Sequence, residues 1–219
     1  KSAPLAEQVR VEEKDDKTGQ VRTTTVERAA QLDGYGNAAS SRYDLAVDGA
    51  FGGQTVLVLD YYGQTFDGPA TALKQKGFSV VVLRHQAPPE KEFRKMLAKS
   101  NQFWLIASCD NSVHLTPGHQ QAVREFFEAG HGVYLWGDND PCNADADKLA
   151  SMLIDARVTG DLPGDQTVGR SQGAGKAGVA TDHLLTTGLE NIYEGVTVAT
   201  VKPSGAMTPI IWGSAGNLV

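Results

Sequence analysis

The sequence predicts an α/β fold in which helices cover both faces of a mainly parallel β-sheet, a three-layer sandwich, with a β-hairpin in front of it. Four apolar, β-type segments lie between residues 55 and 154, and helical patterns separate them. Continuous apolar runs of this length are typical of strands buried on both faces, as parallel strands are. The four segments are residues 55–59, 78–83, 103–107 and 133–136.

The first expected element is a β-hairpin over residues 1–30. Polar and β-branched residues alternate on both sides of a turn-rich stretch at residues 14–19, which is typical of two antiparallel strands. Because an isolated two-stranded hairpin is marginally stable in water, its apolar face should lie on the core, on a sheet edge or on a neighbouring chain. That face is expected to comprise Val9, Val11, Val21, Thr23 and Thr25.

Residues 31–53 are rich in Gly, Ala, Ser and Asn and predict an irregular linker, after which residues 54–219 form the α/β domain. Four helices are expected: from about residue 69, after Pro88-Pro89, after Thr116-Pro117, and over about 144–155 with Asn143 as its cap. Their buried stripes should comprise Phe93, Met96, Leu97, Val123, Phe126, Phe127, Leu149, Met152 and Leu153. The chain stops without a closing helix, so we expect it to be a fragment of a longer protein.

The composition argues against two classes of partner. The net charge is −6 and the pI is near 5.3, and the sequence lacks the clustered Lys and Arg that neutralise nucleic-acid phosphates. No apolar run reaches the roughly 18 residues that a membrane span requires. Neither nucleic-acid binding nor a membrane span is therefore predicted, and the sequence indicates no compartment.

The order of these elements and several motifs resemble the class I glutamine amidotransferase-like superfamily. Leu115-Thr116-Pro117, then a helix and residues 126–132 (FFEAGHG), are similar to the motif that leads into the nucleophile strand of that superfamily. Residues 182–189 (DHLLTTGL) are similar to a segment of its ThuA-like members. The nearest resemblance is to the non-amidotransferase branches, the ThuA-like and intraflagellar-transport-type domains. It covers about residues 54–201 and implies a flavodoxin-like fold.

The sequence departs from the active enzymes of this superfamily at the turn after the fourth strand. In amidotransferases this turn carries a cysteine, and a later His-x-Glu completes the catalytic triad. Here the turn reads Trp136-Gly137-Asp138-Asn139-Asp140, and the chain contains no His-x-Glu. The departure implies that the protein is not an active glutamine amidotransferase.

Ligands of parallel sheets bind in the crevice beyond the carboxyl ends of the strands, and polar residues gather at these ends in the sequence. Their carboxylate and amide oxygens suit Ca²⁺ or Mg²⁺, with Asp138 and Asp140 as the expected metal ligands. The expected crevice comprises Asp60, Tyr61, Tyr62, Cys109, Asp110, Asn111, Gly137, Asp138, Asn139 and Asp140.

The two cysteines, Cys109 and Cys142, allow more than one interpretation. Both follow strands that would be neighbours in a flavodoxin-like sheet, so a disulfide between them is compatible with the fold, and so are two unpaired buried thiols. As a thiol, either could act as a nucleophile with His85, His114 or His183 as its base.

The leading hypothesis is a non-catalytic binding or protein-interaction module that is part of a larger assembly or multidomain protein. The exposed edge of the hairpin favours strand addition, so we expect a protein partner or self-association there. The alternative is a cysteine- or metal-dependent hydrolase that uses the crevice, with Cys109, Cys142 and His183 as candidate catalytic residues.

Overall fold

The computed structural model describes residues 6–15, 18–29, 48–63, 66–173, 175–180, 183–186 and 189–219. Its centre is a four-stranded parallel sheet in the order β4-β3-β5-β6. The strands are β3 (Thr55–Asp60), β4 (Ser79–Arg84), β5 (Gln102–Ile106) and β6 (Gly132–Trp136). This order, with the first strand between the second and the third, is that of a flavodoxin-like fold, and the predicted fold class is confirmed.

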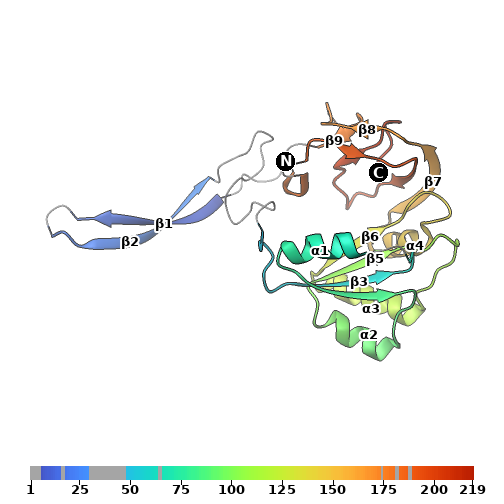
Figure 1. Ribbon diagram of the computed structural model, residues 1–219, viewed down its shortest axis with the longest axis horizontal. Helices are drawn as coiled ribbons and strands as arrows, with labels where there is room; N and C mark the ends of the chain where they lie inside the picture. Colours follow the sequence, from blue (N-terminus) through green and yellow to red (C-terminus); the bar gives the residue numbers. More distant parts are fainter. Residues whose placement is uncertain are drawn as a thin grey trace.

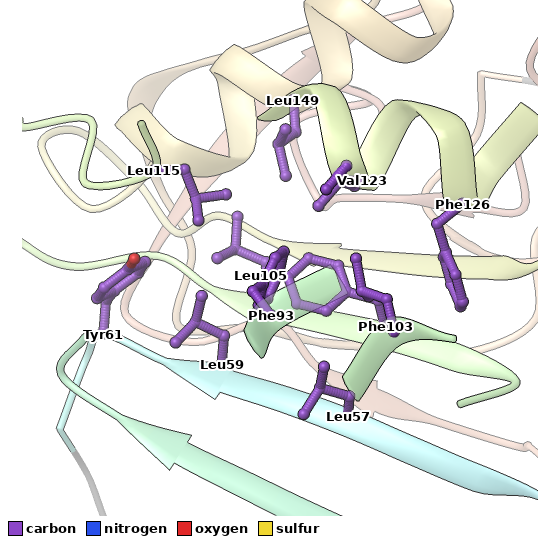
Figure 2. Close-up of a cluster of buried hydrophobic side chains, with 12 residues drawn as sticks. Leu57, Leu59, Tyr61, Phe93, Phe103, Leu105, Leu115, Val123, Phe126 and Leu149 are labelled. Carbon is purple, nitrogen blue, oxygen red and sulfur yellow. The ribbon is translucent and has the colours of Figure 1, made fainter. Parts of the chain in front are cut away.

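Four helices follow the strands: α1 (Asp67–Gln75), α2 (Glu90–Leu97), α3 (Pro117–Glu128) and α4 (Ala144–Ile154). Figure 1 shows α1 on one side of the sheet and α2 and α3 on the other. Because successive side chains of a strand point to opposite faces, Leu57 and Leu59 face α2, α3 and α4, whereas Val56 and Val58 face α1. Figure 2 shows the larger cluster, in which Phe93, Phe103 and Leu149 are fully buried.

The helix boundaries agree with the sequence signals, and one buried-stripe residue needs correction. As expected from Thr116-Pro117, the hydroxyl of Thr116 accepts a hydrogen bond from the amide of His119 at the start of α3. Asn143 is the N-cap residue of α4, as expected, but its side chain makes no capping hydrogen bond, and its amide donates to Asp140. Phe127, expected in the buried stripe of α3, is 36% exposed because it lies one position beyond Phe126, past the edge of that stripe.

The expected hairpin is formed by β1 (Ala6–Lys14) and β2 (Val21–Ala29), which pair along their whole length. The register sets Val9 opposite Val26 and Val11 opposite Thr24. Directly opposed residues share a face, so the expected apolar face was wrong in its β2 half. Val21, Thr23 and Thr25 lie opposite Lys14, Glu12 and Arg10, on the other face.

The C-terminal part consists of antiparallel pairs, none of which is hydrogen-bonded to the four-stranded sheet in the part of the chain that the structure describes. The largest joins β7 (Arg157–Pro163) to β11 (Thr197–Lys202). Two short pairs join β8 (Thr167–Val168) to β10 (Ile192–Tyr193), and β9 (Gly178–Val179) to β12 (Ile211–Trp212). A 3₁₀ turn covers Leu184–Thr186.

Two remaining expectations concern the linker and the membrane. Residues 48–53 of the expected linker form turns, and residues 31–47 lie outside the described residues. Among the described residues, no helix is long and apolar enough to cross a bilayer.

Candidate functional site

The sheet aligns the carboxyl ends of three strands at one level. Asp60 at the end of β3 is in register with Ile106 of β5, and Ile106 is in register with Trp136 of β6. The loops that follow these strands therefore start side by side, and together with Asp60 they contain all ten residues of the expected crevice. Asp60 and Tyr61 form a buried group, and the residues that line cavities beside the C-terminal strands form an open group.

Cys109 and Cys142 form a disulfide. The bond ties the loop after β5 to the loop after β6, which are neighbours in the sheet. The chain contains no other cysteine, so no free thiol is present in this structure. Of the two interpretations of the cysteines, the disulfide is the correct one.

Asp60 and Tyr61 belong to the buried group. The carboxylate of Asp60 is 2% exposed and accepts a hydrogen bond from the amide of Gly63 at 3.1 Å, which closes the turn after β3. Tyr61 packs on the ring of His114 with a centroid separation of 4.7 Å. Burial, and then the charge of Asp145, raise the pKa of the Tyr61 phenol, so this side chain remains neutral.

His114 lies between two carboxylates, a cluster that the sequence did not predict. Its Nδ1 is 2.8 Å from Oδ2 of Asp145, and its Nε2 is 3.2 Å from Oδ2 of Asp110. Because a carboxylate only accepts hydrogen bonds, both contacts are hydrogen bonds at once only when both ring nitrogens carry hydrogen, so the arrangement favours the imidazolium form. Desolvation opposes this charge, but the hydrogen bonds and charges of Asp145 and Asp110 raise the pKa of His114.

The two carboxylates of this cluster are held by backbone amides and a serine hydroxyl. Oδ1 of the fully buried Asp145 accepts from the amide of His114 at 2.8 Å. Asp110 accepts from the hydroxyl of Ser108 at 2.6 Å and the amide of Ser112 at 3.0 Å, and these bonds lower its pKa. The cluster thus joins the loop after β5 to the start of α4. No local sequence pattern indicates this cluster, because 31 residues separate His114 from Asp145.

The expected metal ligands lie in a tightly bonded turn. Asp138 accepts from the amide of Asn139 at 2.8 Å, and the two oxygens of Asp140 accept from Asn143 and from the amide of Gly160. The described residues contain no group of three or more His, Cys, Asp or Glu side chains that could hold a metal ion. A Ca²⁺ or Mg²⁺ site at Asp138 and Asp140 stays a prediction from the sequence.

Two other expected site residues lie apart from this turn. Asn111 is exposed and adopts a positive φ of 59°, which Asn tolerates better than most residues. Nδ1 of His183 accepts a hydrogen bond from the amide of Leu185 at 3.2 Å in the 3₁₀ turn. No hydrogen bond among the described residues joins His183 to either cysteine.

The open group lines two adjoining cavities between the end of β6 and the C-terminal strands. One has a volume of about 540 Å³. It is lined by residues at the carboxyl ends of β3 and β6 and in the loops that follow them, and by residues 193–197; the former are Tyr62, Trp136, Asp138, Asn139 and Cys142. The other, of about 560 Å³, extends along β6 toward β7, β11 and β12. We call the two together the β6 groove. Trp136, Asp138, Tyr193 and Glu194 line both cavities.

Tyr193 and Glu194 were not predicted as site residues. Tyr193 is the second residue of β10 and Glu194 follows it, and this strand of two residues is too short to give a periodic pattern. The sequence pattern also does not indicate that the side chain of Tyr193 is exposed, at 57%.

No protein-family model, no curated protein and no solved structure matches this chain. The resemblance to the amidotransferase-like superfamily therefore stays a prediction from the motifs, and the fold and the residues described above carry the functional argument.

Proposed function

We propose that the protein is a non-catalytic interaction module with an amidotransferase-like fold, and that it associates with a second copy of itself through one face of the hairpin. The observation that carries the proposal is the pairing of β1 with β2. It gathers Val9, Val11 and Val26 on one face, with Thr24 opposite Val11, Glu13 and Arg22 at the end nearest the turn, and Arg28 at the other end. We call this set the valine face.

The valine face is solvent-accessible. Val11 and Val26 are 37% and 41% exposed, and every residue of β2 is exposed. Neither hydrophobic cluster of the described residues includes a hairpin residue. Because a two-stranded hairpin is marginally stable alone, burial of this face against another chain would stabilise it.

The charges on this face favour a second copy as the partner. Glu13 on β1 lies opposite Arg22 on β2. If two hairpins stack face to face about a two-fold axis parallel to the strands, β1 of each copy lies over β2 of the other. Each Glu13 then meets an Arg22 of the other copy, and the valines meet in the middle, as a self-complementary interface requires.

The area predicts that the association is weak. A face of two nine-residue strands measures roughly 30 Å by 10 Å, which is smaller than the approximately 800 Å² that each partner buries in a stable complex. We therefore expect dimers that dissociate on dilution rather than a permanent dimer.

Sedimentation of the full chain over a concentration series tests the proposal. Glu13→Arg and Arg22→Glu should each weaken self-association roughly tenfold, because each places like charges opposite one another. A mixture of the two variants, and the double exchange in one chain, should restore it. Glu12→Arg, on the other face, is the control. A wild-type chain that is monomeric throughout, or single variants that associate as it does, would contradict the proposal.

Two features support the non-catalytic part of the proposal. The turn after β6, residues 136–140, contains no cysteine or serine, whereas the corresponding turn of the amidotransferases carries the nucleophile, and both cysteines are in the disulfide. We expect no ammonia release from glutamine by the purified protein. Release that Cys109→Ala or Cys142→Ala abolishes would show that this part is wrong, and ester hydrolysis that appears only after reduction of the disulfide would favour the cysteine hydrolase.

A further inference from the structure

The β6 groove has the composition of a binding site for a positively charged ligand. Three aromatic side chains, Tyr62, Trp136 and Tyr193, line the smaller cavity together with the carboxylates of Asp138 and Glu194. The rings of Tyr62 and Trp136 are nearly parallel, at an interplanar angle of 21° and a centroid separation of 6.4 Å. Aromatic faces carry partial negative charge and attract cations, Trp most strongly.

Glu194, which lines both cavities, has one buried carboxylate oxygen without a partner among the described residues. Oε2 of Glu194 accepts from the amide of Ser214 at 2.8 Å. Oε1 of the same side chain is buried and accepts no hydrogen bond from the part of the chain that the structure describes. Buried polar atoms are rarely left unpaired because the loss of water is costly. A hydrogen-bond donor supplied by a ligand would satisfy this oxygen.

The lining also excludes ligands of other charge. Neither cavity is lined by a Lys, Arg or His among the described residues. An anion would therefore meet two carboxylates with no compensating positive charge. A quaternary ammonium ion would be attracted to the rings but has no N–H to donate to Oε1.

The larger cavity adds an apolar wall. Val158, Val168, Val198, Val201 and Ile211 line it beside Tyr134 and Trp136. Its volume, about 560 Å³, lies within the range of small-molecule sites. A ligand that extends into it would need an apolar body.

We propose that the β6 groove binds a primary organic ammonium ion with an apolar or aromatic body, whose N–H groups donate to Glu194 and whose charge lies against Trp136. The site does not depend on self-association through the hairpin, which involves none of these residues. Hairpin variants should bind the amine as the wild type does.

Calorimetric titration of the full chain with 2-phenylethylamine hydrochloride tests the proposal. The amine should bind at least roughly tenfold more tightly than 2-phenylethanol, which has the same body without the charge, and phenylacetate should not bind. Glu194→Gln should weaken amine binding by about tenfold or more and leave alcohol binding unchanged, because it removes the charge and keeps the shape. Trp136→Leu should weaken amine binding several-fold.

Glu128→Gln is the matched control, because Glu128 is an exposed carboxylate on α3 away from the groove. It should bind the amine as the wild type does, and thermal melts of each variant establish that it is folded. Three results would overturn the proposal: equal affinity for the amine and the alcohol, no amine binding at millimolar concentration, or a folded Glu194→Gln variant that binds as tightly as the wild type.

Discussion

The two faces of the parallel sheet are closed to different extents. On one face, α2, α3 and α4 bury every apolar side chain that β3 and β5 direct toward them, as for Leu57 and Phe103. On the other face, α1 packs against β3 and β4, and the aromatic residues of β6 stay partly exposed. Tyr134 and Trp136 are 47% and 44% exposed.

The closed face contributes mainly to folding stability, whereas the open half of the other face lines the β6 groove. The closed face holds the larger hydrophobic cluster, and packed apolar area is the main source of folding free energy. The open half of the other face holds Trp136, and it is there that the β6 groove forms beside the C-terminal strands. We expect substitutions on the two faces to affect different properties of the protein.

The largest effect should come from the closed face. Phe93→Ala removes a fully buried ring that packs edge-on against Phe103 and should lower the free energy of unfolding by about 3–5 kcal/mol. Trp136→Ala, on the open half, should lower it by about 1 kcal/mol or less. Urea denaturation of both variants measures the contrast. Equal losses would mean that the open half is also part of the stabilising core.

Loss of the disulfide should have the next largest effect on the free energy of unfolding. The bond links the loops that follow β5 and β6, at the edge of the sheet where the open half lies. The bond spans 33 residues, and constraint of a loop of this length in the unfolded chain stabilises a protein by about 3–4 kcal/mol. The double variant Cys109→Ser/Cys142→Ser should lose this amount in urea denaturation, and the reduced wild type should lose the same. A loss below about 1 kcal/mol would show that the helices alone hold this edge.

The sequence predicted the closed face well and the open half poorly, for physical reasons. Helices such as α3 show a 3.6-residue period and cap signals, and buried parallel strands show apolar runs, so both can be recognised locally. His114 meets Asp145 only through the tertiary fold, and the two-residue β10 has no period. In the hairpin, alternation defines the two faces of each strand, but the length of the turn decides which faces coincide. Val26 was missed for that reason.

A smaller, pH-dependent effect should come from the edge of the closed face, where His114 lies beside Leu115. The pKa of His114 is raised in the folded protein, so its contribution to stability is complete below the unfolded pKa of about 6.5 and is lost as the pH rises through the folded-state pKa. His114→Gln should therefore destabilise the protein more at pH 6 than at pH 9. Urea denaturation at both pH values, with the exposed His131→Gln as control, measures this. An equal loss at both values would exclude a charged His114.

The smallest effect on folding should come from deleting the hairpin. This deletion tests whether the hairpin covers the open half of the sheet or associates with a second copy. If the hairpin associates with a second copy, deletion of residues 1–29 should change the free energy of unfolding by less than about 0.5 kcal/mol, because neither hydrophobic cluster uses hairpin residues. Self-association should be lost.

If the hairpin instead covers the open half of its own sheet, deletion would expose Trp136 further. Tm would then fall by several degrees, and the tryptophan emission would shift to longer wavelength. Thermal melts, fluorescence and sedimentation of the deletion variant distinguish the two arrangements, because only the first leaves folding and emission unchanged while it abolishes the dimer.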